Sequence, residues 1–211
     1  MMTVEGLFGA GDTIGGSAHK FSSGSYTEGR IAAKAAVKYV MDMGNHSPEV
    51  SETEFENLKQ VVFQPMENYE VGRNEIVGGT VSPSYILPLH GLQRLEKIMD
   101  EYVGGTSTNY MTNEPLLTRG LELLAMLRED MGKVAAEDLH QLQRNWELKH
   151  RPVASDAVAH HPLFRTETRW RGYDSRGTHL KPDATDWHRY TTHQPLRAHN
   201  ERDTDTARVD N

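Results

Sequence analysis

The sequence of 211 residues contains no cysteine. That absence excludes disulfides, thiolate zinc sites, a cysteine nucleophile and iron–sulfur clusters held by this chain. It also fits a reducing compartment, so we expect a cytoplasmic protein. The sequence has no apolar run near the length of about 18 residues that a membrane span needs. Its first residues lack the basic and apolar regions of a secretory signal.

Apolar and basic residues are also scarce. Hydrophobic residues make up 36% of the chain, the formal net charge is -7 and the mean hydropathy is -0.66. Because nucleic-acid binding needs a basic patch, and none is readable in the sequence, we expect no nucleic-acid partner. Between Asp42 and Glu75, eight acidic residues stand against two basic ones. A solvated surface explains such a stretch more often than a partner-facing surface does.

Changes in composition divide the chain into four segments and predict an α+β fold that is mainly helical. The length fits one domain or at most two small ones. The segments are a piece of an α/β domain over residues 1–44, an acidic irregular insertion over 45–83 with one short helix over 54–63, a small antiparallel helical bundle over 84–173, and an irregular, partly disordered tail over 174–211.

Small residues dominate the first segment. Residues 7–10 are predicted to form a short buried strand that runs into a Gly-Asp pair, and a glycine loop follows. Ser22 or Ser23 is positioned to cap the next helix, and Gly44 to end it in a left-handed conformation. Since the apolar face of this helix is rich in alanine, we expect it to lie close against a sheet.

Apolar residues at helical spacing predict three helices in residues 84–150. The first stripe runs from Leu89 to Tyr102, the second follows a cap at Thr112 or Asn113, and the third begins at Val134. Short links between them favour an antiparallel bundle. The prolines that follow argue against long helices toward the C-terminus.

The segment with the strongest functional signal is GLFGAGDTIGGSAHKFSSGSYTEGR, residues 6–30. It begins like a dinucleotide fingerprint, but the third glycine is misplaced and the helix starts about a dozen residues too late. We instead expect the strand end to meet the hydroxyls of a cofactor, and the helix start to direct its free N–H groups toward the same ligand. Spacing alone favours a plainer interpretation, a glycine-rich turn and a serine-capped helix without a ligand. The predicted cofactor contacts are Gly11, Asp12, Ser22, Ser23, Gly24 and Ser25.

The string HKFSSGS with EGRIAAK behind it resembles the alpha subunits of the dissimilatory adenylylsulfate reductases, within the wider fumarate reductase/succinate dehydrogenase flavoprotein family. The resemblance continues through LQRLEKIMDEYVGG, NYMTNEPLLTRGLELLAMLRED and AAEDLHQLQRNWELKHR, and covers most of the chain. It implies that residues 1–44 are the C-terminal piece of an FAD-binding domain. The family's N-terminal GxGxxG turn and capping domain are not in this sequence, so we expect a part of a longer subunit that alone binds FAD weakly or not at all.

The resemblance also implies a reaction and roles for individual residues. Members of the family interconvert adenylyl sulfate with sulfite and AMP through a flavin–sulfite adduct, and exchange electrons with an iron–sulfur beta subunit. At matching positions, Asp12 would meet the ribityl arm of FAD, and the helix start over Ser22–Ser25 would face the isoalloxazine ring. His19 would contact the substrate near the flavin, and Lys20 would balance the substrate's negative charge. A histidine that only orders the loop and a lysine that pairs with a carboxylate are the alternatives.

Departures from the family pattern keep other interpretations open. Ala18 and Arg171 stand where the family has glycine and proline. Residues 175–179, SRGTH, with Trp187 after them, are similar to the C-terminal segment of fumarate reductases and succinate dehydrogenases. A flavoprotein of that type is the alternative enzyme, and a helical interaction module is the alternative without catalysis. The C-terminal histidines match no zinc spacing, so we expect no metal site.

Overall fold

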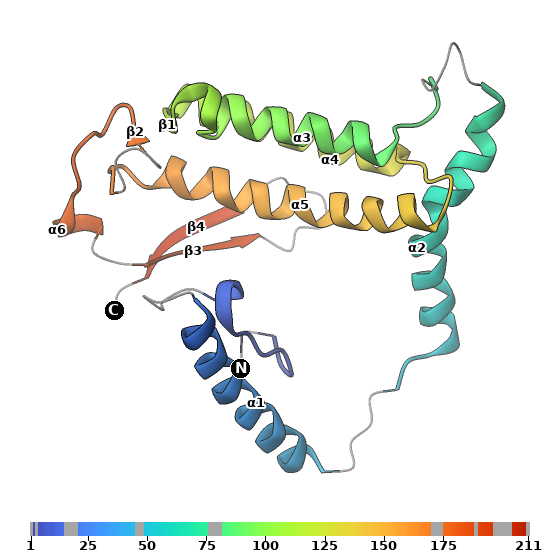
Figure 1. Cartoon of the computed structure of the whole chain (residues 1–211), viewed down its shortest axis with the longest axis horizontal. Coiled ribbons are helices and arrows are strands. Elements are labelled where there is room, and N and C mark those ends of the chain that lie inside the picture. Colours follow the sequence, from blue (N-terminus) through green and yellow to red (C-terminus); the bar gives the residue numbers. More distant parts are fainter. Residues whose placement is uncertain are drawn as a thin grey trace. The chain divides into compact units, whose positions relative to one another are not determined.

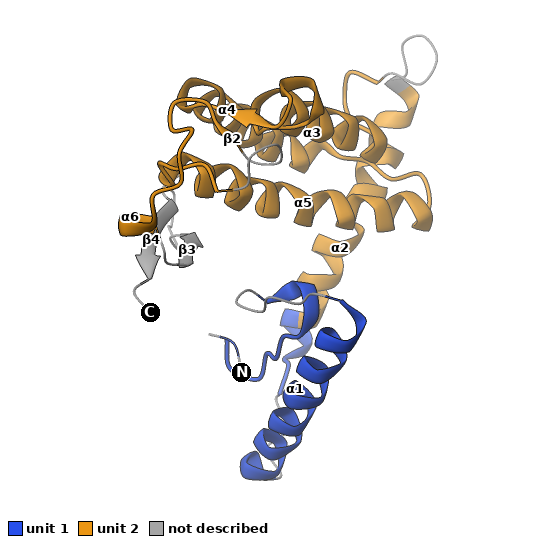
Figure 2. Cartoon of the chain, turned by 60° about the vertical axis from the view of Figure 1, so that its left-hand side comes forward, with its two compact units in different colours: residues 1–54 blue, residues 55–211 orange. Residues whose placement is uncertain are grey.

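The computed structural model describes residues 2, 4–14, 21–44, 49–75, 82–169, 175–187, 190–195 and 204–209. The chain separates into two compact units, residues 1–54 and residues 55–211 (Figure 2). Helices make up most of the described chain (Figure 1). The mainly helical fold that the sequence predicts is therefore confirmed.

The first unit contains one long helix, α1 (Ser22–Met43), and a 3₁₀ turn over Gly11–Thr13. The predicted strand over residues 7–10 is wrong. Leu7 bonds only within its own turn: its carbonyl accepts from Met2 N–H at 2.8 Å, and its N–H donates to Val4 at 3.1 Å. A strand needs a hydrogen-bonded neighbour, and none lies beside these residues in the described part of the chain.

Helix α1 ends as predicted but begins differently. Gly44 follows its last turn with a φ of +63°, a conformation that glycine adopts at little cost. Phe21, and not Ser22 or Ser23, occupies the N-cap position, and its side chain makes no capping hydrogen bond. The two serines lie inside the first turn, so their hydroxyls cannot take the capping position. No residue of α1 is buried, and no sheet covers its alanine-rich face among the described residues.

Helix α2 (Glu52–Gly72) corrects the prediction of an irregular segment with a short helix over 54–63. Its start is a capping box: Ser51 Oγ accepts from Glu54 N–H at 3.2 Å, and Glu54 Oε2 accepts from Ser51 N–H at 3.0 Å. Pro65 lies inside the helix, where it is buried. Its carbonyl accepts from Ala136 N–H at 2.8 Å, so tertiary contact offsets the usual cost of an internal proline.

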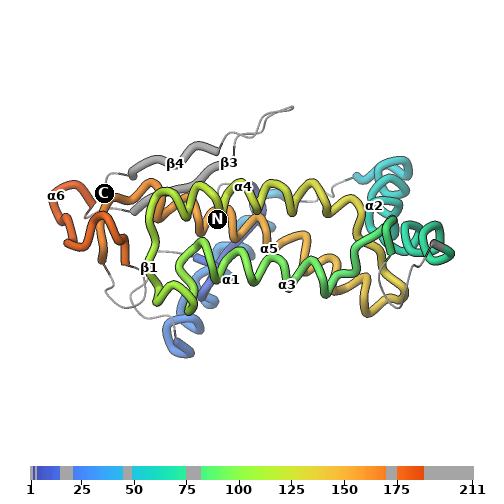
Figure 3. Tube along the Cα trace, turned by 90° about the horizontal axis from the view of Figure 1, so that it is seen from above, coloured from blue at the N-terminus to red at the C-terminus, as the bar shows by residue number. Residues whose placement is uncertain are grey.

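The second unit is built on three helices: α3 (Pro88–Tyr102), α4 (Glu114–Asp130) and α5 (Leu139–Phe164). Figures 1 and 3 show them lying side by side, as the predicted bundle requires. Burying a leucine side chain contributes about 1.5–3 kcal/mol, so their shared core is the main source of stability. The core consists of Leu95, Ile98, Val103, Leu117, Leu124, Leu127, Val134, Leu148 and Ala159.

Local details of the bundle are partly as predicted. Asn113 caps α4, with its Oδ1 accepting from Leu116 N–H at 2.9 Å. The third helix begins at Leu139, because Val134 instead forms a parallel bridge with Ile86. The expectation that prolines forbid a long helix is wrong, since α5 continues through two prolines for 26 residues.

The described part of the tail contains three strands where an irregular chain was predicted, and the first of them pairs with a strand of the bundle segment. Strand β1 (Met111–Thr112) pairs in parallel with β2 (Ser175–Arg176), and the short helix α6 (Ala184–Trp187) follows. Strand β3 (Tyr190–Pro195) pairs antiparallel with β4 (Thr204–Val209). Threonine and valine in these segments favour strands despite the polar composition.

Replacing Gly105 by alanine is expected to destabilise the bundle. The new Cβ would overlap the backbone of Asp100, whose carbonyl oxygen lies 2.9 Å from its position. Such overpacking costs about 1–3 kcal/mol, measured as a lower free energy of unfolding in urea. Gly132→Ala is the matched control, because no atom lies within 4 Å of its added Cβ. Equal stability of the two variants would contradict this contact.

A pH-dependent contact lies within α5, beside an ion pair that joins α5 to α4. Arg128 Nη2 and His160 Nδ1 each lie 3.5 Å from Asp156 Oδ2. The hydrogen bond to Asp156 raises the pKa of His160 above its ordinary value of 6.5, against the opposing effect of burial. The stabilisation is thus fully present below pH 6.5 and is lost as the pH rises through the raised pKa. We expect His160→Gln to lower Tm at pH 6 more than at pH 9, and a pH-independent difference would disprove the pairing.

Candidate functional site

The predicted cofactor residues come together where the 3₁₀ turn meets α1. Gly11 is buried with a φ of +67°, and its N–H donates to Glu28 Oε2 at 2.7 Å. A Cβ on Gly11 would lie 3.3 Å from Ser25 Oγ and would be strained at that φ. This position therefore requires glycine and holds the turn directly against the second turn of the helix.

The start of α1 presents polar groups to solvent. Asp12, Ser22 and Ser23 are exposed, while Gly24 and Ser25 are half-buried. Ser25 N–H donates to the Phe21 carbonyl at 2.9 Å, the first bond of the helix. The side chain of the N-cap residue Phe21 makes no capping hydrogen bond to the preceding N–H groups. A helix start carries about half a positive charge, which favours a negatively charged group nearby.

His19 and Lys20 lie outside the described residues, as does the glycine loop before them. Their predicted roles therefore stay predictions. Glu28 is the site residue that sequence reasoning missed. Its position in the second turn of a helix gives no sign that it accepts from the backbone of Gly11, 17 residues earlier.

A second polar cluster follows α5. The Glu167 side chain is fully buried and accepts from Arg165 Nε at 2.8 Å, from Arg169 Nη2 at 3.3 Å and from Asp183 N–H at 2.7 Å. Burial raises the pKa of Glu167, but these three donors outweigh it and hold the pKa below its ordinary value of 4.5. We call Glu167 and its three donors the carboxylate clasp.

The clasp fixes the segment that resembles fumarate reductases. Trp187 is 2% exposed, and its ring meets Phe164 edge-on at 5.4 Å. Its carbonyl accepts from Arg165 and Arg169 at 2.6 and 2.8 Å. Arg176 is 3% exposed and donates from Nη1 to the Pro162 carbonyl at 2.6 Å. The cluster therefore supports the fold around the end of α5.

Comparison with known proteins relates the chain to one enzyme subunit. The sequence is 43% identical over 187 residues to the adenylylsulfate reductase alpha subunit of Megalodesulfovibrio gigas, covering 89% of this chain and 28% of that subunit. The adenylylsulfate reductase structure from Archaeoglobus fulgidus matches 90% of this chain and 29% of its own, at 45% identity and a TM-score of 0.83. Over the length it spans, this chain is a homologue of the adenylylsulfate reductase alpha subunits. The resemblance read from the HKFSSGS string is confirmed.

Other comparisons place the fold more widely. A structure of adenosine-5-phosphosulfate reductase in complex with sulfite, as a covalent adduct, has the same identity, coverage and TM-score as the Archaeoglobus structure. The E. coli quinol fumarate reductase matches 89% of this chain and 29% of its own at 18% identity and a TM-score of 0.65, which shows the flavoprotein fold alone. No family model matches the sequence. The chain spans less than a third of the length of the adenylylsulfate reductase alpha subunit from M. gigas.

No helix in the described part of the chain is both long and apolar enough to cross a membrane. The described residues also contain no group of three or more histidine or carboxylate side chains arranged to hold a metal ion.

Removing the clasp carboxylate is expected to destabilise the second unit. Glu167→Ala leaves Arg165 and Arg169 without their shared partner, at a cost of about 3 kcal/mol. Because the pKa of Glu167 is lowered, the stabilisation is present above pH 4.5 and is lost as the pH falls through the lowered pKa. The measurement is the difference in unfolding free energy from the unmodified chain at pH 7 and pH 3. Glu122→Ala, at an exposed carboxylate that pairs with Arg119, serves as the control and should cost under about 1 kcal/mol.

Proposed function

We propose that this chain is part of the alpha subunit of an FAD-dependent adenylylsulfate reductase, which interconverts adenylyl sulfate with sulfite and AMP. The observation that carries the proposal is the 43% identity over 89% of the chain to such a subunit. Substrate, activity and partner belong to the whole subunit, of which this chain spans the smaller part.

The residues at the start of α1 support an FAD contact in this proposal. Gly11 lets the turn approach Ser25 of the helix closely, and its N–H is held by Glu28, so both contacts keep Asp12 beside the helix start. In this proposal the exposed Asp12 carboxylate accepts from ligand hydroxyls, and the N–H groups of Ser22 and Ser23 donate to the ligand. FAD, when bound, supplies the two-electron chemistry of this reaction class.

The protein's own contribution at this site is electrostatic and positional. The partial positive charge at the helix start stabilises negative charge on the nearby ring edge. His19 donates a hydrogen bond to the sulfo group or acts as an acid, and Lys20 balances the charge of the anionic substrate. Neither role involves a residue of the carboxylate clasp.

The family relationship supports an iron–sulfur beta subunit as the partner that exchanges electrons with the flavoprotein. It also supports a cytoplasmic location, which agrees with a sequence free of cysteine. The alternative of a fumarate- or succinate-type dehydrogenase rests on the SRGTH segment. Ser175 and Arg176 of that segment pair with β1, and Arg176 N–H donates to Thr168 Oγ1, so the shared fold explains the similarity of the segment.

A chimeric subunit tests the proposal. The part of the M. gigas alpha subunit that matches this chain is replaced by this chain and produced together with the beta subunit. The chimera is expected to contain FAD, to reduce adenylyl sulfate with a reduced dye as donor, and to leave fumarate unchanged. His19→Ala should lower turnover of adenylyl sulfate by at least about 100-fold while FAD content is retained.

Two further variants distinguish the role of His19 in turnover from the role of Gly11 in FAD binding. His90→Ala is the matched control for His19→Ala, because His90 is exposed at the start of α3, and it should not change turnover. Gly11→Ala should lower the FAD content, since the added Cβ disturbs the turn against α1. A chimera that reduces fumarate but not adenylyl sulfate would overturn the proposal.

A further inference from the structure

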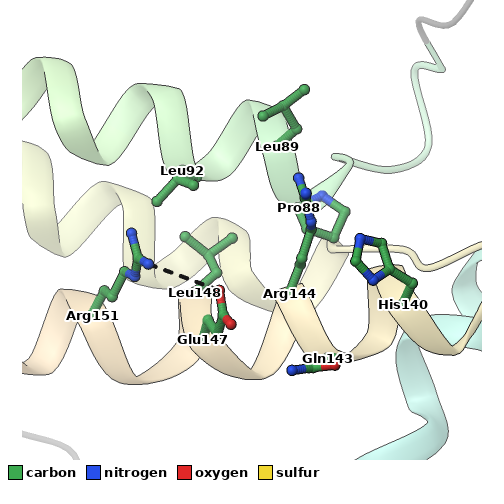
Figure 4. Close-up of a pocket in the computed structure, with 9 residues that line it drawn as sticks. All are labelled: Pro88, Leu89, Leu92, His140, Gln143, Arg144, Glu147, Leu148 and Arg151. Atoms are coloured by element: carbon green, nitrogen blue, oxygen red, sulfur yellow. Dashed lines mark ion pairs between the residues drawn. The ribbon is translucent and has the colours of Figure 1, made fainter.

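A groove with an apolar floor runs between α3 and α5, with a volume of about 310 Å³ (Figure 4). The first turns of α3 supply its apolar wall, and the first half of α5 supplies its polar wall. Leu89 on the α3 side is 47% exposed, so this apolar surface is open to solvent. The lining residues are Pro88, Leu89, Leu92, His140, Gln143, Arg144, Glu147, Leu148 and Arg151.

The polar wall of the groove carries excess positive charge. Arg144 makes no ion pair among the described residues. Arg151 lies 3.8 Å from Glu147, a loose pair at the surface. Figure 4 shows Arg144 and Arg151 about two turns apart on α5, with Glu147 and Leu148 on the turn between them. The groove therefore suits a segment that brings apolar side chains together with carboxylates.

Helix α2 has such a segment at its N-terminal half. Its C-terminal half is fixed to the bundle, where Asn68 Nδ2 donates to the carbonyls of Gly132 and Val134 at 3.1 and 2.9 Å. The N-terminal half extends beyond this contact and exposes Phe55 by 58% and Leu58 by 62%. Three glutamates and one lysine accompany these apolar side chains: Glu52, Glu54, Glu56 and Lys59.

We propose that two copies of this chain associate by inserting the N-terminal half of α2 of each copy into the α3–α5 groove of the other. The acidic, apolar half-helix and the basic, apolar groove are complementary in charge and in character. Within one chain no residue of α2 lines the groove, because the bond of Pro65 to Ala136 and those of Asn68 hold the helix elsewhere. Reciprocal insertion covers both surfaces at once and closes with two-fold symmetry.

The association is expected to be weak and sensitive to salt. One contact between a half-helix of about three turns and a groove buries less than the roughly 1,600 Å² of a standard interface. The two-fold repeat doubles this area, so we expect a dissociation constant in the micromolar range. Because charged groups line the contact, raising the salt concentration should weaken it.

Charge reversal in two matched variants tests the arrangement. One variant carries Arg144→Glu and Arg151→Glu in the groove, and the other carries Glu52→Lys and Glu56→Lys on α2. Sedimentation equilibrium of the 211-residue chain should show dimers, and each variant alone should dimerise at least about tenfold more weakly, because like charges then face one another. An equimolar mixture of the two variants should restore dimers, since both contacts of the mixed pair are again opposite in charge.

A control variant removes the effect of net charge. Lys97→Glu with Arg119→Glu makes the same charge change at two exposed residues that do not line the groove, and it should dimerise like the unmodified chain. Circular dichroism at each step verifies that all variants are folded. A monomeric unmodified chain would overturn the proposal. So would variants that dimerise normally alone, or a mixture that stays monomeric, because α2 would then not be the occupant of the groove.

Discussion

The second unit depends on the packing of α5 against α3 and α4. Leu148 on α5 and Leu124 on α4 are almost completely buried, and α3 meets Leu148 through Gly91, where a Cβ would lie 2.5 Å from the Leu148 side chain. A larger residue at Gly91 would separate α3 from α5. The close approach of these two helices therefore shapes both the groove between them and the core beneath it. The carboxylate clasp then extends this packing beyond the end of α5.

The sequence predicts those features that depend on local pattern. Apolar stripes identify α3 and α4, the Asn113 cap follows from its residue type and position, and Gly44 follows from its place after the last turn of α1. Each of these depends on residues a few positions apart. A single sequence contains that information directly.

Features that depend on distant contacts are those that the sequence misses. A proline inside α2 is tolerated because Pro65 is buried and its carbonyl bonds to Ala136, and that contact cannot be read from neighbouring residues. The same holds for Glu28 and Gly11, and for Glu167 with its donors up to 16 residues away. The acidic character of α2 suggested an irregular insertion, although glutamate is a good helix former and Ser51 with Glu54 forms a capping box.

Helix α1 has no buried residue, so we expect it to open locally more often than the bundle does. Ile31, Val37 and Val40 are each at least 60% exposed, so tertiary packing contributes little to holding this helix together. Its amide protons should therefore exchange with deuterated solvent long before those of the bundle. The polar start of α1 would then become rigid only when other structure covers that exposed face, so Ser22–Ser25 would be among the last residues of the chain to become fully ordered.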